Sequence, residues 1–208
     1  MFYPLFLSLV GEKCLVVGAG KVAARKAASL ARCKADVYVV GEKVCDEMRE
    51  LIDGGKARHV GQRFAEDQLE GAALVFGATD SVSVNREVYD QARKLGIPVN
   101  VVDDLDLCSF IVPSVVRRGD LSIAISSSGK SPAVTKRLRK RLEEEFGDEW
   151  GIYVEIMGEA REKAKQSSEG QKTREKIFNE LADSDILAKI KAGDIDGAKR
   201  LAREIIAK

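Results

Sequence analysis

The segment with the clearest chemical potential is a glycine turn at Gly18-Ala19-Gly20, which follows an apolar run and precedes an alanine-rich segment. In the pattern Gly18-x-Gly20-x-x-Ala23, the first glycine permits a tight turn, and the second lets a pyrophosphate approach the backbone. The small residue Ala23 allows close packing of helix on strand. Because free N–H groups at a helix start attract phosphate, we predict dinucleotide binding here; a merely structural turn is the alternative.

Two charged residues bear on which dinucleotide this would be. Glu42 and Lys43 follow the predicted strand Asp36–Val40. An acid near this position binds the ribose hydroxyls of NAD, whereas a cation can meet the 2′-phosphate of NADP. Solvated loop charges without a ligand are the alternative interpretation. The prediction favours NAD, with Glu42 as the ribose ligand.

A pair of carboxylates in "NVVDDLD", residues 100–106, could supply acid–base chemistry. Asp103 and Asp104 follow a predicted parallel strand, and ligands of doubly wound sheets bind beyond the carboxyl ends of the strands. A partly desolvated carboxylate at that edge could act as a general base. Aspartates that only cap a turn are the alternative.

Three other features carry weaker chemical signals. His59 is the sole histidine, so we expect a structural role for it and no histidine metal cage. The loop "SSSGKS", residues 126–131, is not a P-loop, because Ala124 stands where the first glycine is required; it could cap a helix or hold a carboxylate. The basic run at residues 137–141 could attract a polyanionic small molecule or be a solvated face, and aromatic residues for base stacking are absent from it.

The elements that would position these residues alternate between strand and helix. The pattern predicts strands at residues 14–17, 36–40, within 57–64, at 73–79 and 97–102, with helices at 21–31 and 85–95. It therefore predicts an α/β fold with a Rossmann-type, doubly wound parallel sheet. Two further strands flank Arg118-Gly119-Asp120, and Ser131 and Pro132 begin a helix. Charged helices follow Gly147, with a polar break at residues 164–175. We place domain boundaries near Pro113 and Gly147, giving domains 1–113, 114–146 and 147–208.

The composition indicates a soluble protein. The chain has 208 residues, 45% of them hydrophobic, and its net charge of +1 gives no general attraction to nucleic acid or to an anionic membrane. Four cysteines without a C-x-x-C pair are expected to be reduced. The apolar N-terminus lacks a basic start, so we expect it to pack on the core and not to be a signal peptide or a membrane span. These features predict a cytoplasmic location.

Several motifs in order resemble one family. The segments "YPLFLSLVGEKCLVVGAGKVAARKAASL", "VFGATDSVSVN" and "VNVVDDLDLCSFIVPSVVRRGDLSIAISSSGKSPAVTKRLRKRLEEEF" are similar to the dehydrogenase/chelatase module of siroheme synthesis. The resemblance covers about residues 2–146; beyond Gly147 the chain matches only as a small helical domain, and no counterpart of the family's methyltransferase domain is expected. It implies an NAD-binding Rossmann domain at 1–113, a dimerisation region at 114–146 and a helical C-terminal domain at 147–208, assembled as a homodimer.

The resemblance also implies the reaction and the site. The expected reaction is NAD-dependent oxidation of the tetrapyrrole precorrin-2 to sirohydrochlorin, followed in many members by insertion of Fe²⁺, which is a substrate without a standing metal site. The family's essential aspartate matches Asp103. Substrate contacts carry over to Asn100 and Ser127, although Ser128 replaces a more frequent glycine. Besides the two glycines and Ala23, the cofactor contacts match Lys21, Val22, Glu42, Lys43 and Thr79.

Two alternatives stay open. One is a dehydrogenase without chelatase activity, because Asp103 would serve either reaction. The other is a nucleotide-sensing Rossmann module, which explains the glycine turn but not the later hairpin and basic helix. An interaction protein without an enzymatic role leaves the glycine turn unexplained.

Overall fold

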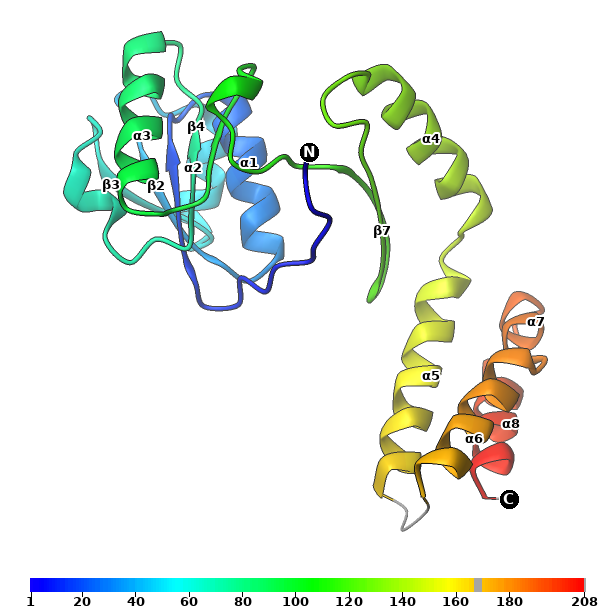
Figure 1. Cartoon of the computed structure of the whole chain (residues 1–208). Coiled ribbons are helices and arrows are strands. Elements are labelled where there is room, and N and C mark those ends of the chain that lie inside the picture. Colours follow the sequence, from blue (N-terminus) through cyan, green and yellow to red (C-terminus); the bar gives the residue numbers. More distant parts are fainter. Residues whose placement is uncertain (167–169, 208) are drawn as a thin grey trace. The chain divides into compact units, whose positions relative to one another are not determined.

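The computed structural model describes residues 1–166 and 170–207, which form two compact units, Met1–Val112 and Pro113–Lys208. The first unit contains a five-stranded sheet, and the second a two-stranded sheet with helices (Figure 1). Within the described parts of the chain, no helix has the length and apolar character needed to span a bilayer.

The sheet of the first unit is entirely parallel, which confirms the predicted Rossmann-type fold. Its strand order is β3-β2-β1-β4-β5, so the chain starts at the centre, winds to one edge, and then crosses to the other side of β1. The continuous apolar sequence of the central strands is the pattern expected for strands buried on both faces. The strands are β1 (Lys13–Val17), β2 (Asp36–Val40), β3 (Arg58–Gly61), β4 (Leu74–Gly77) and β5 (Val99–Val101).

Helices cover both faces of this sheet, because alternate strand residues point to opposite sides. Cys14 and Val16 of β1 pack with α1 (Lys21–Arg32) and α2 (Asp46–Asp53), whereas Leu15 and Val17 pack with α3 (Val82–Lys94). Helix α2 was not predicted from the sequence, because its eight residues bury only Met48 and so show too little apolar periodicity. Two 3₁₀ helices complete the unit, η1 (Glu66–Leu69) and η2 (Leu105–Leu107).

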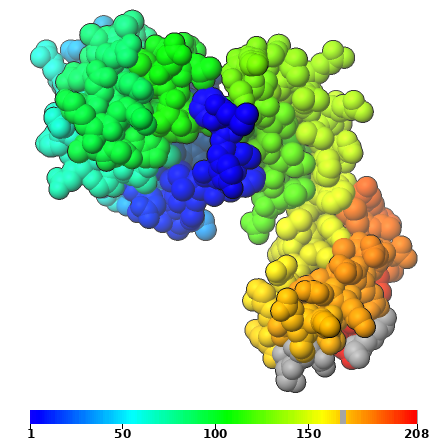
Figure 2. All heavy atoms as spheres, viewed as in Figure 1, coloured from blue at the N-terminus to red at the C-terminus, as the bar shows by residue number. Residues whose placement is uncertain are grey.

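The N-terminal segment differs from its prediction. Leu9 is buried, but the residues before it have no regular structure and form the dark blue surface in Figure 2. The expectation that this segment packs on the core is therefore wrong for most of its side chains within a single chain. The exposed apolar residues are Met1, Tyr3, Leu5, Phe6, Leu7 and Val10.

The second unit begins with the predicted hairpin. Strands β6 (Ser114–Arg118) and β7 (Leu121–Ile125) pair in antiparallel register, and α4 (Pro132–Glu145) follows, with the Ser131 hydroxyl accepting a hydrogen bond from the Val134 N–H. The hairpin turn lies against the start of α5 (Glu149–Gln166). The contact is so close that a Cβ on Gly151 would lie 3.0 Å from the Arg118 carbonyl carbon. Glycine at this position thus permits the close contact.

Among the described residues, four helices form the rest of this unit around their own apolar core. They are α5, α6 (Gln171–Asp183), α7 (Ile186–Lys191) and α8 (Ile195–Ile206). The expected polar break at residues 164–175 overlaps the end of α5 and the start of α6, and positions 167–169 lie outside the described residues. The core residues are Ile156, Ala160, Leu181, Ile186, Ile190, Ala198, Ala202 and Ile205.

Candidate active site

A cleft of about 850 Å³ lies at the carboxyl ends of the strands of the first unit. Its position follows from the winding of the sheet: the connections leave β1 and β4 in opposite directions, and ligands of such sheets bind where the strand order reverses. Most of the predicted cofactor and catalytic residues line it, which brings together side chains from the ends of four strands. Those residues are Gly18, Gly20, Lys21, Val22, Glu42, Lys43, Thr79 and Asp103.

The two glycines of the turn have different roles. Gly18 has a φ of 121°, and a Cβ there would overlap the carbonyl oxygen of Ala78, so the fold requires glycine at this point. Gly20 has a φ of −81°, which any residue can adopt, and a Cβ there would meet no protein atom within 4 Å. A side chain at position 20 would therefore extend into open space at the cleft, where a ligand would lie.

The start of α1 fits a pyrophosphate. Gly20 is the N-cap residue and provides no capping side chain, and the Ala24 N–H donates to the Gly20 carbonyl oxygen at 2.9 Å. Val22 and Ala23 come before Ala24 in the chain, so their N–H groups have no acceptor within the helix. Ala23 itself is buried and does not line the cleft, in agreement with a packing role for its side chain. The Lys21 ammonium lies 3.8 Å from a Glu47 carboxylate oxygen at the start of α2.

The glycine turn is braced by the segment after β2. A Cβ on Gly41 would lie 2.8 Å from that of Ala19, and the Cys45 N–H donates to the Ala19 carbonyl oxygen at 3.0 Å. His59 Nε2 lies 2.8 Å from the Gly41 carbonyl oxygen, so the histidine supports this segment. Glu42 and Lys43 are consequently held beside the turn, exposed and lining the cleft.

Thr79 is fixed by a buried amide on α3. Asn85 Oδ1 accepts hydrogen bonds from the Thr79 hydroxyl at 2.8 Å and from the Thr79 N–H at 3.2 Å. Asn85 Nδ2 donates to the Thr79 carbonyl oxygen at 2.9 Å. These three bonds hold the loop after β4 against the helix, and sequence patterns did not single out Asn85.

The two neighbouring aspartates after β5 have different surroundings. The Asp104 carboxylate accepts hydrogen bonds from the N–H groups of Asp106 and Leu107 at 3.1 and 3.3 Å, and so caps η2. Asp103 is exposed at the cleft and has a φ of 62°, a left-handed conformation that is uncommon for a residue with a side chain. The turn-capping role therefore belongs to Asp104, and Asp103 is available to a ligand.

The two predicted substrate residues lie elsewhere. Asn100 on β5 is 8% exposed, and its Nδ2 donates to the Phe110 carbonyl oxygen at 2.9 Å and contacts Cys108 Sγ at 3.3 Å. Ser127 belongs to the second unit, where its hydroxyl accepts a hydrogen bond from the Ser131 N–H at 2.9 Å. Neither residue lines the cleft.

Some lining residues were missed by sequence reasoning. Gln62, Arg63 and Phe64 follow β3 and line the cleft beside the segment after β2. The rule that ligands bind beyond the carboxyl ends of parallel strands could have found them. No group of three or more histidine, cysteine, aspartate or glutamate residues suited to a metal occurs among residues 1–166 and 170–207.

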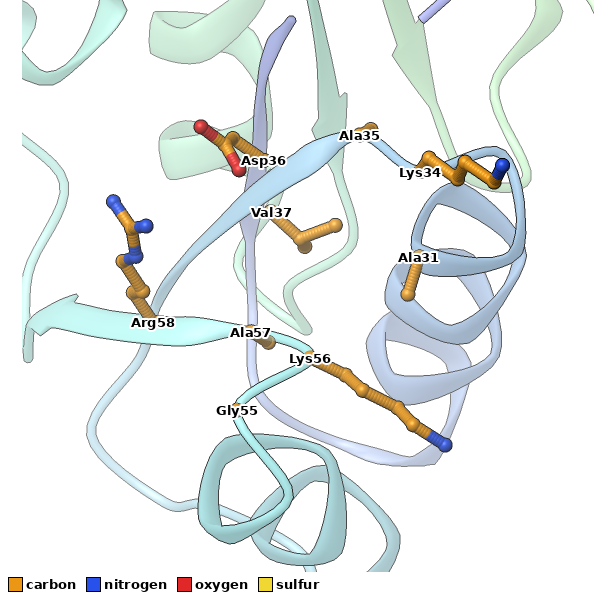
Figure 3. Close-up of a pocket in the computed structure, with 9 residues that line it drawn as sticks. All are labelled: Ala31, Lys34, Ala35, Asp36, Val37, Gly55, Lys56, Ala57 and Arg58. Atoms are coloured by element: carbon orange, nitrogen blue, oxygen red, sulfur yellow. The ribbon is translucent and has the colours of Figure 1, made fainter. Parts of the chain in front are cut away.

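A second, smaller hollow of about 230 Å³ lies at the amino ends of β2 and β3. Figure 3 shows Lys34 and Lys56 extending on the α1 side of β2, whereas Asp36 and Arg58 lie on the other side. Arg58 Nη1 donates to the Tyr38 hydroxyl at 3.0 Å. The charged groups around this hollow thus diverge, and they do not face a common point.

Comparisons with known proteins agree with this geometry. The chain matches the family model described as "Putative NAD(P)-binding" over residues 5–114 and the model described as "Sirohaem biosynthesis protein central" over residues 118–145. It is 37% identical to a siroheme synthase of Nitrosospira multiformis, over 98% of this chain and 44% of that protein. It is 36% identical to a siroheme synthase of Pseudoalteromonas translucida, over 96% of this chain and 42% of that protein. The chain therefore spans less than half the length of these curated relatives.

A solved structure extends the likeness to the whole fold. SirC, a precorrin-2 dehydrogenase, superposes with a TM-score of 0.81 at 25% sequence identity, over 99% of both chains. The NAD(P)-binding model alone covers more than half of the present chain, and the siroheme central region follows it in the same order. The chain therefore belongs to the NAD(P)-binding family of the first model and continues into the sirohaem biosynthesis central region of the second.

Proposed function

We propose that this protein oxidises precorrin-2 to sirohydrochlorin with NAD⁺. The observation that carries the proposal is the position of Asp103, an exposed carboxylate without a capping role at the edge of the cleft that begins at the glycine turn. The siroheme synthase relatives and the precorrin-2 dehydrogenase SirC support this choice of substrate.

The cleft divides into two halves around the glycine turn. Glu42, on the β2 side, would bind the adenosine ribose, and the N–H groups of Val22 and Ala23 would hold the pyrophosphate. The other half of the cofactor would extend toward Thr79 and Asp103, which follow β4 and β5. When bound there, NAD⁺ supplies the hydride acceptor.

Asp103 would act as the general base. Oxidation of precorrin-2 removes two electrons as a hydride together with one proton, and the Asp103 carboxylate takes that proton. Asp103 has a left-handed backbone, and the N–H groups of η2 are capped by Asp104 and not by Asp103. Asn100 Oδ1 has no hydrogen-bond donor within the described residues, and so it could accept a bond from a pyrrole N–H.

NAD is favoured over NADP because Glu42 would repel a 2′-phosphate. Lys43 and Arg63 also line the cleft, and their positive charges would attract a 2′-phosphate. If Glu42 decides the preference, Glu42→Gln should weaken NAD⁺ binding and improve NADP⁺ binding relative to the unmodified protein. Unchanged affinities for both cofactors would assign the discrimination to another residue.

A second reaction, insertion of Fe²⁺ into sirohydrochlorin, is also proposed. Chelation releases two pyrrole protons, and Asp103 could accept them in turn. A dehydrogenase without chelatase activity is the alternative, and the two share the same aspartate. The assay for chelation supplies sirohydrochlorin and Co²⁺ or Fe²⁺ without NAD⁺, so that it is independent of oxidation.

We further expect a homodimer formed through the second unit. An isolated two-stranded sheet is only marginally stable and leaves open edges. Val134 and Leu138 on α4 are also exposed, with 52% and 43% of their surface accessible. Light scattering at micromolar concentration should give twice the mass of one chain. Cys14, Cys45 and Cys108 are free thiols, which fits a reducing compartment such as the cytoplasm.

The deciding experiment is anaerobic incubation with precorrin-2 and NAD⁺, followed by absorbance of sirohydrochlorin and NADH. Formation of the two in equal amounts is expected. NAD⁺ binding without turnover of precorrin-2 would favour the nucleotide-sensing alternative. Metal is added in a second step, and turnover without metal insertion would leave the dehydrogenase-only alternative.

A further inference from the structure

One half-buried cation near Asp103 has no role in the site described so far. Lys26 lies on α1, somewhat less than two helical turns after Gly20. Its ammonium is 5.1 Å from the ring centroid of Phe76 on β4. Phe76 in turn contacts Phe110 edge to face, with ring centroids 5.4 Å apart. The lysine is therefore held on an aromatic surface near the carboxyl ends of β4 and β5.

The ammonium of Lys26 is not neutralised by a close carboxylate. Within residues 1–166 and 170–207, no carboxylate oxygen lies within 4.0 Å of it. Burial lowers the pKa of Lys26, and the neighbouring Arg25 lowers it further, whereas Cys108 and Asp103 act in the opposite direction. Burial also raises the pKa of the Cys108 thiol, so at neutral pH it supplies no negative charge.

An unpaired cation in this position is unfavourable in the free protein. A methionine or leucine could cover Phe76 without the loss of hydration that a charged group suffers on burial. The cation–π contact compensates for only part of that loss of hydration. A lysine at this place gains most when an anionic ligand approaches it.

Two anionic groups could bind Lys26, namely the cofactor pyrophosphate and a carboxylate of the substrate, and their positions differ. The cofactor pyrophosphate would lie at the N–H groups of Val22 and Ala23, and Lys26 does not line the cleft that holds them. Asp103 does line that cleft, and it follows β5, whose Asn100 pairs in the sheet with Phe76, the residue that Lys26 contacts. A substrate that reaches Asp103 from outside the cofactor cleft would therefore bring its own negative groups toward Lys26.

We propose that Lys26 binds a carboxylate of the tetrapyrrole substrate and so places the macrocycle against Asp103. The inference rests on the proposed function and names a binding residue that neither the glycine turn nor the aspartate pair indicated. Phe76 and Phe110 would serve as the apolar support that orients the lysine, and Arg25 beside it remains exposed to solvent.

The test compares three variants in a binding assay without NAD⁺. Lys26→Met keeps the apolar stem and removes the charge, Lys26→Arg keeps the charge, and Arg25→Met removes the same charge from the adjacent position. The probe is sirohydrochlorin, titrated by its absorbance and by quenching of protein fluorescence. Lys26→Met should weaken binding roughly 10- to 100-fold, the range of a lost charge-assisted hydrogen bond. Arg25→Met should change it less than about threefold, as expected for an exposed charge.

Cofactor affinity and turnover complete the test. NAD⁺ affinity should be unchanged in Lys26→Met, which also verifies that the variant is folded, and the KM for precorrin-2 should rise. Equal sirohydrochlorin affinity in Lys26→Met and the unmodified protein would overturn the proposal while leaving the proposed function intact. Equal losses of sirohydrochlorin affinity in Lys26→Met and Arg25→Met would also overturn the proposal. They would indicate general electrostatic attraction to the positive surface and not a specific contact with Lys26. If the unmodified protein neither binds sirohydrochlorin nor oxidises precorrin-2, the proposed function itself fails.

Discussion

The two ends of the parallel sheet both carry polar and charged residues around a hollow, but they arrange them differently. At the carboxyl ends, glycines, amides and carboxylates from several loops converge on one cleft of about 850 Å³. At the amino ends, Lys34, Lys56 and Arg58 surround a hollow of about 230 Å³, but their side chains diverge (Figure 3). Charge alone therefore does not make a site. What distinguishes the carboxyl end is convergence, together with backbone N–H groups that the fold leaves without acceptors.

The largest expected effect of a change at the carboxyl end concerns Asp103. Asp103→Asn should lower the rate of precorrin-2 oxidation about 10²–10⁴-fold, because it removes the proposed general base. Affinity for NAD⁺ should persist, since the phosphate-binding N–H groups are unaffected. NADH formation under saturating substrates measures the rate.

Asp104→Ala is the matched control for that change. It removes the cap of η2 and should lower the free energy of unfolding by about 1 kcal/mol, with little effect on the rate. If Asp104→Ala abolishes activity and Asp103→Asn does not, the neighbouring carboxylate is the base. If neither change reduces oxidation, the base lies outside this segment.

The next effect separates the two glycines of the turn. Gly20→Val should leave the fold intact and weaken NAD⁺ binding roughly 100-fold, because its side chain would occupy the place of the pyrophosphate. Gly18→Ala should instead destabilise the protein by more than about 2 kcal/mol, because of its positive φ and its overlap with Ala78. Calorimetric titration with NAD⁺ and thermal unfolding distinguish the two outcomes. Normal NAD⁺ affinity in a folded Gly20→Val protein would contradict the assigned phosphate position.

A smaller effect is expected at Asn85, which acts on the cleft only through Thr79. Asn85→Ala removes three hydrogen bonds and should lower the free energy of unfolding by about 1–3 kcal/mol. NAD⁺ affinity should fall by less than in Gly20→Val, since the phosphate contacts remain. Asn85→Asp keeps both acceptor contacts to Thr79 and should recover part of the affinity. Full NAD⁺ affinity in Asn85→Ala would show that the loop after β4 needs no such support.

The smallest effect should follow from changes at the amino end. Lys34→Met and Lys56→Met, made singly, should each change the oxidation rate and NAD⁺ affinity by less than about twofold, because exposed, divergent charges contribute little to a distant site. Loss of activity in either variant would remove the contrast between the two ends and indicate a second ligand site.

Much of the carboxyl end could be predicted because local sequence determines it. The turn Gly18–Gly20 follows a continuous apolar strand and precedes a helix, so its conformation follows from neighbours in the chain. The same holds for the winding of the sheet, which alternating strands and helices predict. For Asp103 and Asp104, sequence suggested both a catalytic and a capping role, and only the hydrogen bonds to Asp106 and Leu107 assign the cap to one of them.

The remaining features depend on contacts between residues distant in sequence. Lys26 is one of several basic residues on an alanine-rich helix until its contact with Phe76 on another strand is known. Short α2 has too few buried positions for a periodic pattern. The exposed apolar residues before Leu9 have the composition of a core segment, and composition cannot reveal that a single chain leaves them uncovered.

The strand order β3-β2-β1-β4-β5 also has a consequence during synthesis of the chain. Strand β1 pairs with β2 soon after both leave the ribosome, but its other edge stays open until β4 is made, because Cys14 pairs with Leu74. During that interval, the nascent protein presents an apolar strand edge of the kind that invites misassembly or a chaperone. The edge of β4 in turn stays open until β5 is made, because Val75 pairs with Val99. The β6–β7 hairpin has no such delay, because its strands are joined by a two-residue turn and can pair within microseconds. Slowing translation between Asp36 and Val101 should therefore lower the yield of folded protein, whereas slowing it after Val101 should not.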